Sequence, residues 1–372
     1  MRKCSRLAAL AAVAAATAAA IPASAAASQA FISRFHEIHT LASAVPASGP
    51  AMGDQNPYGV AVVPRTEGKL IRGNVLVSNF NNSQNQQGTG SSIVEISPRG
   101  QVSTFAIVPQ PTDTPAVGLT TALVALRSGF VVVGSLPAPG GMGSAARAGA
   151  LTVLNARGEV VATIKGGDIN GPWDMTAVDH GDRAVLFVTN VLNGTVAAGG
   201  NTVRDGTVVR ITLKFNRGHT PEVTSNRVIA SGFAEHTDPN ALVVGPTGVG
   251  LGRDGILYVA DSNNNRIAAV PDALTRTTVL RGGGRTLSVG GALNDPLGLL
   301  IAPNGDVVSA NGANGNIVET SPAGQQVATK ELVHAGGGDL FGLALVPEER
   351  GIYFVNDIGS GPAANSLQAL TR

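Results

Sequence analysis

The stretch PTGVGLGRDGILYVADSNNNRI, residues 246–267, contains the pattern that decides the fold. A small residue opens an apolar run, a turn with glycine follows, and a second β-rich run ends in Asp261 before a polar stretch. Weaker copies come before and after it along the chain. Such recurrence is typical of stacked units that bury a core only together. We therefore expect one repeat domain, although 372 residues would suit two or three average domains.

Six copies can be aligned on the residue that opens the first apolar run. A blade of four strands takes about 40 to 50 residues, and the first three intervals are longer, so they must contain insertions. The inserted stretches are polar and rich in glycine, and each follows the second strand of its copy. Equivalent positions in a radial array face the same way, so these loops are expected on one rim. The aligned openers are Gly59, Gly118, Trp173, Gly248, Gly298 and Gly342, and the insertions are residues 79–92, 135–149 and 190–206.

The composition favours an all-β protein with short strands. Hydrophobic residues make up 43% of the chain and aromatic residues only 4%, so the core must be built from Val, Leu, Ile and Ala, and 48 glycines supply turns. The expected fold is a six-bladed β-propeller of four-stranded antiparallel blades. The last copy has three strands, so we expect residues 33–43 to supply the fourth and close the ring. The expected blades are residues 51–110, 111–167, 168–233, 240–286, 290–334 and 338–372.

The first residues have the pattern of a cleaved secretory signal peptide, assigned to residues 1–27. Arg2, Lys3 and Arg6 precede an apolar run that is too short to span a bilayer permanently, and small residues follow Pro22. Cleavage would remove Cys4, the only cysteine, and leave residues 28–372 as one secreted or periplasmic domain.

The charge that remains after cleavage limits the partners. Of 26 basic side chains, 23 would remain against 25 acidic ones. This low, slightly acidic charge argues against nucleic acid, which requires a basic face. No second apolar stretch reaches membrane-spanning length, and we expect a monomer.

The segment at 246–267 resembles the NHL repeat. Weaker copies of it are VSNFNN, FVTNVLNG, VSANGANGNIV and YFVND, and the resemblance covers residues 56–372. It implies a six-bladed β-propeller, in agreement with the count of copies. Two features depart from the pattern, namely Trp173 in place of a small opener and the long third copy.

The second strand of each copy ends in a polar residue. Six such residues at equivalent radii would form a ring at the channel mouth and offer oxygen ligands to a bound molecule or cation. The alternative is structural, because Asn, Asp and Ser also bond to the backbone of their own turn. The six residues are Asn79, Ser135, Asn190, Asp261, Asn311 and Asn356.

Four further residues are candidates for the same mouth. His236 and Asp238 lie in the connection into the fourth copy, where a histidine beside carboxylates could act as a general base or ligand, and His334 lies before the sixth. The alternative is an exposed polar loop. Trp173 could offer a stacking platform to a ligand, or it could fill space beside glycines.

Two functions follow as hypotheses. The first is a binding or scaffolding protein that presents the loops of blades one to three, and the polar channel mouth, to a protein, peptide or glycan. The alternative is a divalent-metal-dependent enzyme of lyase or lactone hydrolase type, which the resemblance to propeller enzymes implies, with a cation such as calcium in the channel. Because the ring has a single carboxylate, Asp261, it is poor in the negative charge that calcium sites recruit.

Overall fold

The computed structural model describes residues 29–110, 116–216, 220–334 and 337–372. The expected signal peptide lies outside this range. Within these residues, no helix is both long and apolar enough to cross a membrane.

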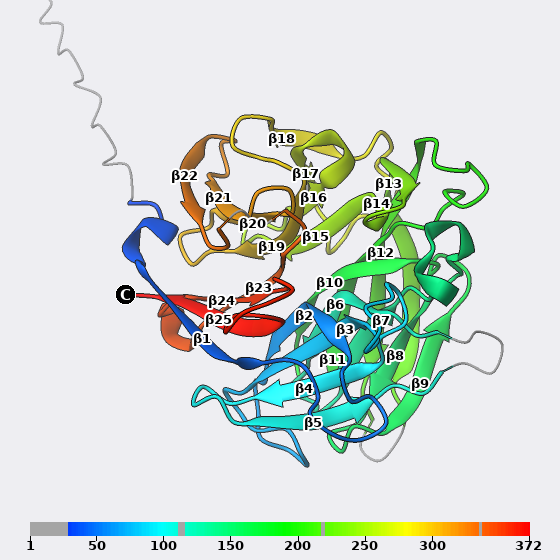
Figure 1. Cartoon of the computed structure of the whole chain (residues 1–372). Helices are drawn as coiled ribbons and strands as arrows, with labels where there is room; N and C mark the ends of the chain where they lie inside the picture. The colour runs from blue at the N-terminus through cyan, green and yellow to red at the C-terminus, as the bar shows by residue number, and fades with distance from the viewer. Residues whose placement is uncertain (1–28, 111–115, 217–219, 335–336) are drawn as a thin grey trace, which may run out of the picture.

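Six sheets surround a central axis, which confirms the predicted propeller (Figure 1). In blades one, two, four and five, four consecutive strands pair antiparallel, and the first is innermost. The first two blades are β2 (Gln55–Val62), β3 (Val75–Asn81), β4 (Ser92–Ile96) and β5 (Val102–Ile107), then β6 (Leu119–Ala125), β7 (Val131–Ser135), β8 (Ala150–Leu154) and β9 (Val160–Lys165). The fourth and fifth are β15 (Pro246–Leu251), β16 (Leu257–Asp261), β17 (Arg266–Val270) and β18 (Arg285–Val289), then β19 (Pro296–Ile301), β20 (Val307–Asn311), β21 (Asn316–Thr320) and β22 (Gln326–Glu331).

The third blade has a fifth strand. Its strands are β10 (Pro172–Asp179), β11 (Arg183–Asn190), β12 (Val203–Lys214), β13 (Glu222–Asp238) and β14 (Leu242–Val244). The end of β13 turns back and pairs with β14, with His236 opposite Val244. This β13–β14 hairpin lies beyond the expected end of the blade and becomes part of the site described below.

The sixth blade joins both ends of the described chain, as predicted. Strands β23 (Leu340–Leu345), β24 (Ile352–Asn356) and β25 (Ser366–Thr371) are completed by β1 (Glu37–Ser43), which pairs antiparallel with β25. The preceding 3-10 turn, η1 (Ile32–Arg34), is fastened to the fifth blade, because the Glu319 carboxylate accepts bonds from the amides of Phe31 at 2.7 Å and Ile32 at 2.8 Å. The ring is therefore closed by a strand and by a carboxylate clasp.

The sequence forms these strands because each blade is covered by neighbours on both faces. Strands β3, β16 and β24 are buried at every residue, as expected for apolar runs without polar alternation. The outermost strand β22 alternates between half-buried and exposed residues. Each innermost strand contacts the innermost strand of the next blade, and β23 contacts β2.

Glycine allows the innermost strands to approach one another around the channel. A Cβ atom on Gly248, Gly298 or Gly342 would lie 2.1, 2.0 or 2.2 Å from a main-chain oxygen of the next blade. Such distances are far below van der Waals contact, so only glycine fits at this position, which we call the channel position.

The second and third blades depart from this rule and correct part of the sequence alignment. The strand register places Thr121 and Asp174 at the channel position, while the expected openers Gly118 and Trp173 lie earlier in the chain. In these two blades, the side chains at the channel position form hydrogen bonds to the next blade, where a glycine would allow the two main chains to pack closely. Thr121 Oγ1 donates to the main-chain oxygen of Trp173 at 2.5 Å, and Asp174 Oδ2 accepts a bond from the amide of Val249 at 3.1 Å.

Candidate functional site

A cavity of about 520 Å³ occupies the end of the channel where the innermost strands begin. Its floor comes from the residues just before the channel position, and its rim from the residues that precede β19 and follow β24. Its walls come from the loop between β3 and β4 and from the β13–β14 hairpin. We call it the mouth cavity. Its lining includes Asn56, Tyr58, Asn81, Trp173, Val243, Asp295, Leu297, Phe341 and Asp357.

The floor of the mouth cavity is aromatic. Tyr58 stacks on Phe80 with ring centroids 4.6 Å apart and lies 4.0 Å from the ring of Phe341. Trp173 meets Tyr58 edge to face at 5.9 Å. Because these rings pack on one another, the floor is a rigid apolar surface.

Acidic groups surround the rim. Burial raises the pKa of Asp357 to about 8, and the negative charge of Asp339 adds to the rise. The two residues share one backbone contact, since the amide of Asp357 donates to the carbonyl oxygen of Asp339 at 2.8 Å. Burial also raises the pKa of Asp295, with a further rise from Asp238 that His236 partly offsets. None of the described residues that line the cavity is a lysine or an arginine.

Two buried amide oxygens beside the cavity have no partner within the described protein. Asn56 is 5% exposed and Asn81 is 2% exposed, and the Oδ1 atom of each accepts no hydrogen bond. The Asn81 amide is oriented by its other end, since Nδ2 donates to Asn85 Oδ1 at 2.7 Å. A buried carbonyl oxygen without a donor is costly, so these atoms suit a ligand that donates hydrogen bonds.

The mouth cavity is partly covered by insertions from different blades. Gln87 Nε2, in the loop of the first blade, donates to the carbonyl oxygen of Asn240 at 2.6 Å. In the second blade, 3-10 turn η3 (Gly143–Ala145) packs on the hairpin so closely that a Cβ atom on Gly143 would lie 2.6 Å from the Leu242 oxygen. Leu242 is buried and has φ +63°, a strained conformation for leucine. The long loops thus gather on one rim and form its cover.

The six polar residues at the strand ends do not line this cavity. They are 0–9% exposed, and their side chains bond to neighbouring strands and connecting segments. Asn79 Nδ2 donates to the Ala44 oxygen at 2.8 Å, and Asn311 Nδ2 donates to the Ala292 oxygen at 2.7 Å. Asn356 Oδ1 accepts a bond from the amide of Ile358. The geometry favours the structural alternative, and a ligand role stays a prediction for Asn79, Ser135, Asn190, Asp261, Asn311 and Asn356.

The alternation of side chains along a strand explains why the residues that line the cavity are one position later than the predicted ones. Successive side chains of a strand point to opposite sides. Asn311 and Asn356 point into their blades, whereas the next residues, Gly312 and Asp357, line the mouth cavity. Asp357 and Asp295 were both missed by the sequence reasoning. The Asp295-Pro296 pair that begins the fifth blade was an available signal.

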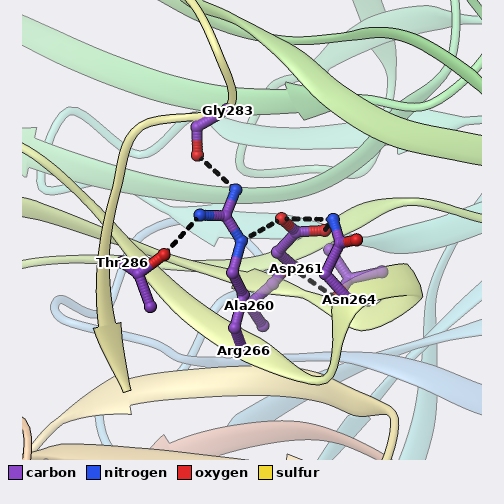
Figure 2. A network of polar contacts seen from close by, with 7 residues as sticks. Ala260, Asp261, Asn264, Arg266, Gly283 and Thr286 are labelled. Carbon is purple, nitrogen blue, oxygen red and sulfur yellow. Dashed lines mark hydrogen bonds and ion pairs between the residues drawn. The ribbon is translucent and has the colours of Figure 1, made fainter. Parts of the chain in front are cut away.

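Asp261 shows the structural role most clearly (Figure 2). Its carboxylate is fully buried and accepts bonds from Arg266 Nε at 2.6 Å and from Asn264 Nδ2 at 3.0 Å. Arg266 continues to Thr286 Oγ1 and to the oxygen of Gly283, both at 2.8 Å. This residue therefore holds the outer strands of the fourth blade together.

The remaining candidates fall in different places. Trp173 lines the mouth cavity and also packs in its floor, so both interpretations apply to it. His236 Nε2 lies 3.9 Å from Asp238 Oδ2 within the hairpin, and Asp238 Oδ1 accepts the amides of the turn. His334 has a side chain that is 95% exposed and bonds only to Glu331, which places it away from the channel.

A second cavity of about 470 Å³ occupies the opposite end of the channel. Its walls are mainly the apolar side chains of the innermost strands, and Asp174 reaches it from the third blade. Burial raises the pKa of Asp174 to about 8, while bonds from the amides of Met175 and Val249 partly offset the rise. Because this carboxyl is already bonded to the protein, the mouth cavity is the better candidate site.

Comparison with known proteins agrees with the architecture. Residues 244–269 match the NHL repeat. No curated protein matches the chain. Similar solved structures include a gluconolactonase from Xanthomonas campestris, with 14% identity, 91% of this chain and 90% of that chain covered, and a TM-score of 0.55. The PQQ-bound aldose sugar dehydrogenase from Streptomyces coelicolor has 13% identity, coverage of 90% and 98%, and a TM-score of 0.56.

Another is the calcium-binding protein regucalcin from Agrobacterium tumefaciens, with 14% identity, coverage of 91% and 94%, and a TM-score of 0.52. At such low identity these likenesses show the fold and nothing finer. The chain is therefore a six-bladed β-propeller in which residues 244–269 match the NHL repeat.

Proposed function

We propose that this propeller is an enzyme of hydrolase or lyase type that acts on a small organic molecule in the mouth cavity, with Asp357 as the general acid and base. One observation carries the proposal. The unpartnered oxygens of Asn56 and Asn81 lie beside a partly covered cavity that Asp357 also lines. A concave site with a few oriented polar groups and a perturbed titratable group is the usual form of an active site.

The acidic groups suit proton transfer near neutral pH. With a pKa of about 8, the Asp357 carboxyl exchanges its proton near neutral pH, so as a carboxylate it can take a proton as a base and then donate that proton to a leaving group as an acid. Burial raises the pKa of Tyr58, and the negative charges of Asp357 and Asp295 add to the rise, so its hydroxyl stays a neutral donor. The amide oxygens of Asn56 and Asn81 would orient the substrate.

The fold and the loops support an enzyme more than a scaffold. Similar solved propellers include a gluconolactonase and a sugar dehydrogenase, which places small-molecule chemistry on this fold elsewhere. The loops of the first two blades contribute to the walls and cover of the mouth cavity. They are therefore engaged with the protein itself, whereas a scaffold would leave them free. Export through residues 1–27 stays part of the proposal.

A divalent cation stays a prediction that the donor set supports weakly. The expected ligands at the strand ends are buried and bonded to other parts of the protein. The described residues include no cluster of three or more His, Cys, Asp or Glu side chains able to hold a metal. Calcium prefers six to eight converging oxygens, several of them carboxylate. The residues do not fit such a centre, and metal analysis of the purified protein would test this.

The single tryptophan of the chain provides a direct test, because Trp173 lines the mouth cavity. Its fluorescence can be followed while small lactones, esters and glycosides are added. Turnover of lactones and esters can be measured by proton release, and turnover of glycosides by release of the reducing sugar. Asp357→Asn should abolish turnover while ligand-induced fluorescence changes persist. The matched control is Asp168→Asn, which removes the same charge from an exposed turn. Full turnover in Asp357→Asn, or no response to any compound, would refute the proposal.

A further inference from the structure

We propose that the ligand of the mouth cavity is an organic ammonium ion, whose charged nitrogen lies at the acidic rim while its apolar body rests on the aromatic floor. This inference rests on the proposed function only in taking the mouth cavity as the working site. It adds the chemical class of the ligand.

The first argument is the one-sided charge of the site. Two carboxyl groups line the mouth from different blades, namely Asp295 before β19 and Asp357 after β24. Asp238 of the β13–β14 hairpin and Asp339 before β23 lie close enough to raise the pKa of Asp295 and of Asp357, respectively. None of the described residues that line the cavity is a lysine or an arginine, and His236 is the basic group that acts on the pKa of Asp295. An anionic ligand would be repelled by this field, and a cation would be attracted. The titratable groups that line the site are Tyr58, Asp295 and Asp357, and those whose charges act on them are His236, Asp238 and Asp339.

The second argument comes from the buried amide oxygens. Asn56 Oδ1 and Asn81 Oδ1 can only accept hydrogen bonds, and no described group donates to either. An ammonium group has N–H donors and no acceptor, so it satisfies these oxygens and the carboxylates together. A ligand carboxylate would leave the amide oxygens without a donor. The unpartnered atoms therefore favour a ligand that donates hydrogen bonds, and an ammonium group is such a donor.

The third argument concerns the apolar half of the cavity. Tyr58, Trp173, Leu297 and Phe341 line it together with Val243. A hydrated metal ion gains nothing from such a surface, whereas the hydrocarbon part of an amine is stabilised by burial there. Aromatic rings also attract cations through their quadrupoles. An organic cation is the ligand that uses both halves of the site.

Proton linkage gives the inference a distinctive signature. Asp357 has a pKa of about 8, so most of its population is protonated at neutral pH, and the pKa of Asp295 is also raised. A bound cation stabilises the ionised carboxylates and lowers these values. Binding must then release protons, and affinity must rise as the pH increases from 6 toward and beyond 8. A neutral ligand of the same shape would show no such increase.

The test compares cyclohexylmethylammonium with cyclohexylmethanol, which share their shape but not their charge. Calorimetry at pH 6 and pH 8.5, in buffers of different ionisation enthalpy, measures affinity and proton release for each probe. We expect the amine to bind at least tenfold more tightly than the alcohol at pH 8.5 and to release protons. Equal affinity for the two probes, or no binding of the amine, would overturn the inference.

Variants locate the effect. Asp357→Asn should weaken amine binding about tenfold and reduce its pH dependence, and Asp168→Asn should change neither. Asp295→Asn is the second variant, should Asp357→Asn fail to fold. The proposal would also be contradicted if calcium chloride displaced the bound amine while neither variant changed the affinity for the amine. If the alcohol binds as well as the amine while Asp357→Asn still abolishes turnover, this inference fails and the proposed function stands.

Discussion

Arg266 donates a hydrogen bond from Nε to Oδ2 of Asp261 at 2.6 Å, and the two side chains are 13% and 0% exposed (Figure 2). The pair connects the end of β16 with the beginning of β17. The guanidinium also donates hydrogen bonds to Thr286 in β18 and to Gly283, which precedes that strand. The segment at 246–267, which resembles the NHL repeat, thus contains a structural ion pair, and it does not line the mouth cavity.

Removal of this arginine should destabilise the propeller. In Arg266→Ala, the carboxylate of Asp261 remains buried without its cation, and we expect a loss of about 3 to 5 kcal/mol in the free energy of unfolding. Chemical denaturation measures this. The double variant with Asp261→Asn should recover part of the loss, because no unpaired charge is then buried. The control Arg285→Ala changes an exposed residue at the beginning of β18 and should have little effect.

The clasp at Glu319 should contribute to ring closure. Glu319→Gln keeps one acceptor oxygen but loses the charged bonds to the amides of Phe31 and Ile32, so we expect about 1 to 3 kcal/mol of destabilisation. Limited proteolysis near residue 35 should accelerate in parallel. Glu331→Gln, at the exposed end of β22 in the same blade, should leave both measurements unchanged. Unaltered proteolysis in Glu319→Gln would contradict the clasp.

Glu235 should make stability depend on pH. It is fully buried, its Oε2 atom has no described partner, and burial raises its pKa to about 8. Because the folded pKa exceeds the ordinary value of 4.5, stability is greatest below that pH and falls as the pH rises to 8. Glu235→Gln should reduce this fall, to which Asp174 and Asp357 also contribute, and be more stable than the parent by about 2 kcal/mol or more at pH 8. Thermal unfolding from pH 4.5 to pH 9 checks this, and Glu222→Gln, exposed on the same strand, should retain the parent's profile.

Close packing at the channel position should tolerate no side chain. In Gly298→Ala, the added Cβ atom would lie 2.0 Å from the carbonyl oxygen of Phe341, so the fifth and sixth blades must separate. We expect about 3 kcal/mol of destabilisation, at the upper end of ordinary overpacking. Gly359→Ala is the matched control, since nothing lies within 4 Å of its added Cβ atom. Equal melting temperatures for the two variants would refute the account.

The architecture was predictable from the sequence because its causes are local. Apolar runs that end in polar turns recur along the chain, and the missing strand of the last copy left one place for residues 33–43. The site was not predictable in the same way. Side chains alternate along a strand, so the register of β24 against β23 decides whether Asn356 or Asp357 faces the mouth. A bulge in β23, between Leu340 and Leu343, shifts this register.

The cover of the mouth was also beyond the sequence pattern. Nothing in the residues around His236 distinguishes a loop from the β13–β14 hairpin, because that hairpin is held by contacts with other blades. Gln87 reaches Asn240 across 153 positions of sequence. Tertiary contacts of this kind determine which polar residues surround a ligand, and local propensity does not report them.

The pairing of β1 with β25 determines how the propeller responds to mechanical force. Glu37 lies opposite Thr371, so the outward-leading ends of the two strands are neighbours. Tension applied between these ends would load the hydrogen bonds one after another, like a zipper, whereas tension along the strands in opposite directions would load all of them at once. The ring is therefore expected to open at low force when it is pulled by both ends, and to stay intact when it is tethered by only one.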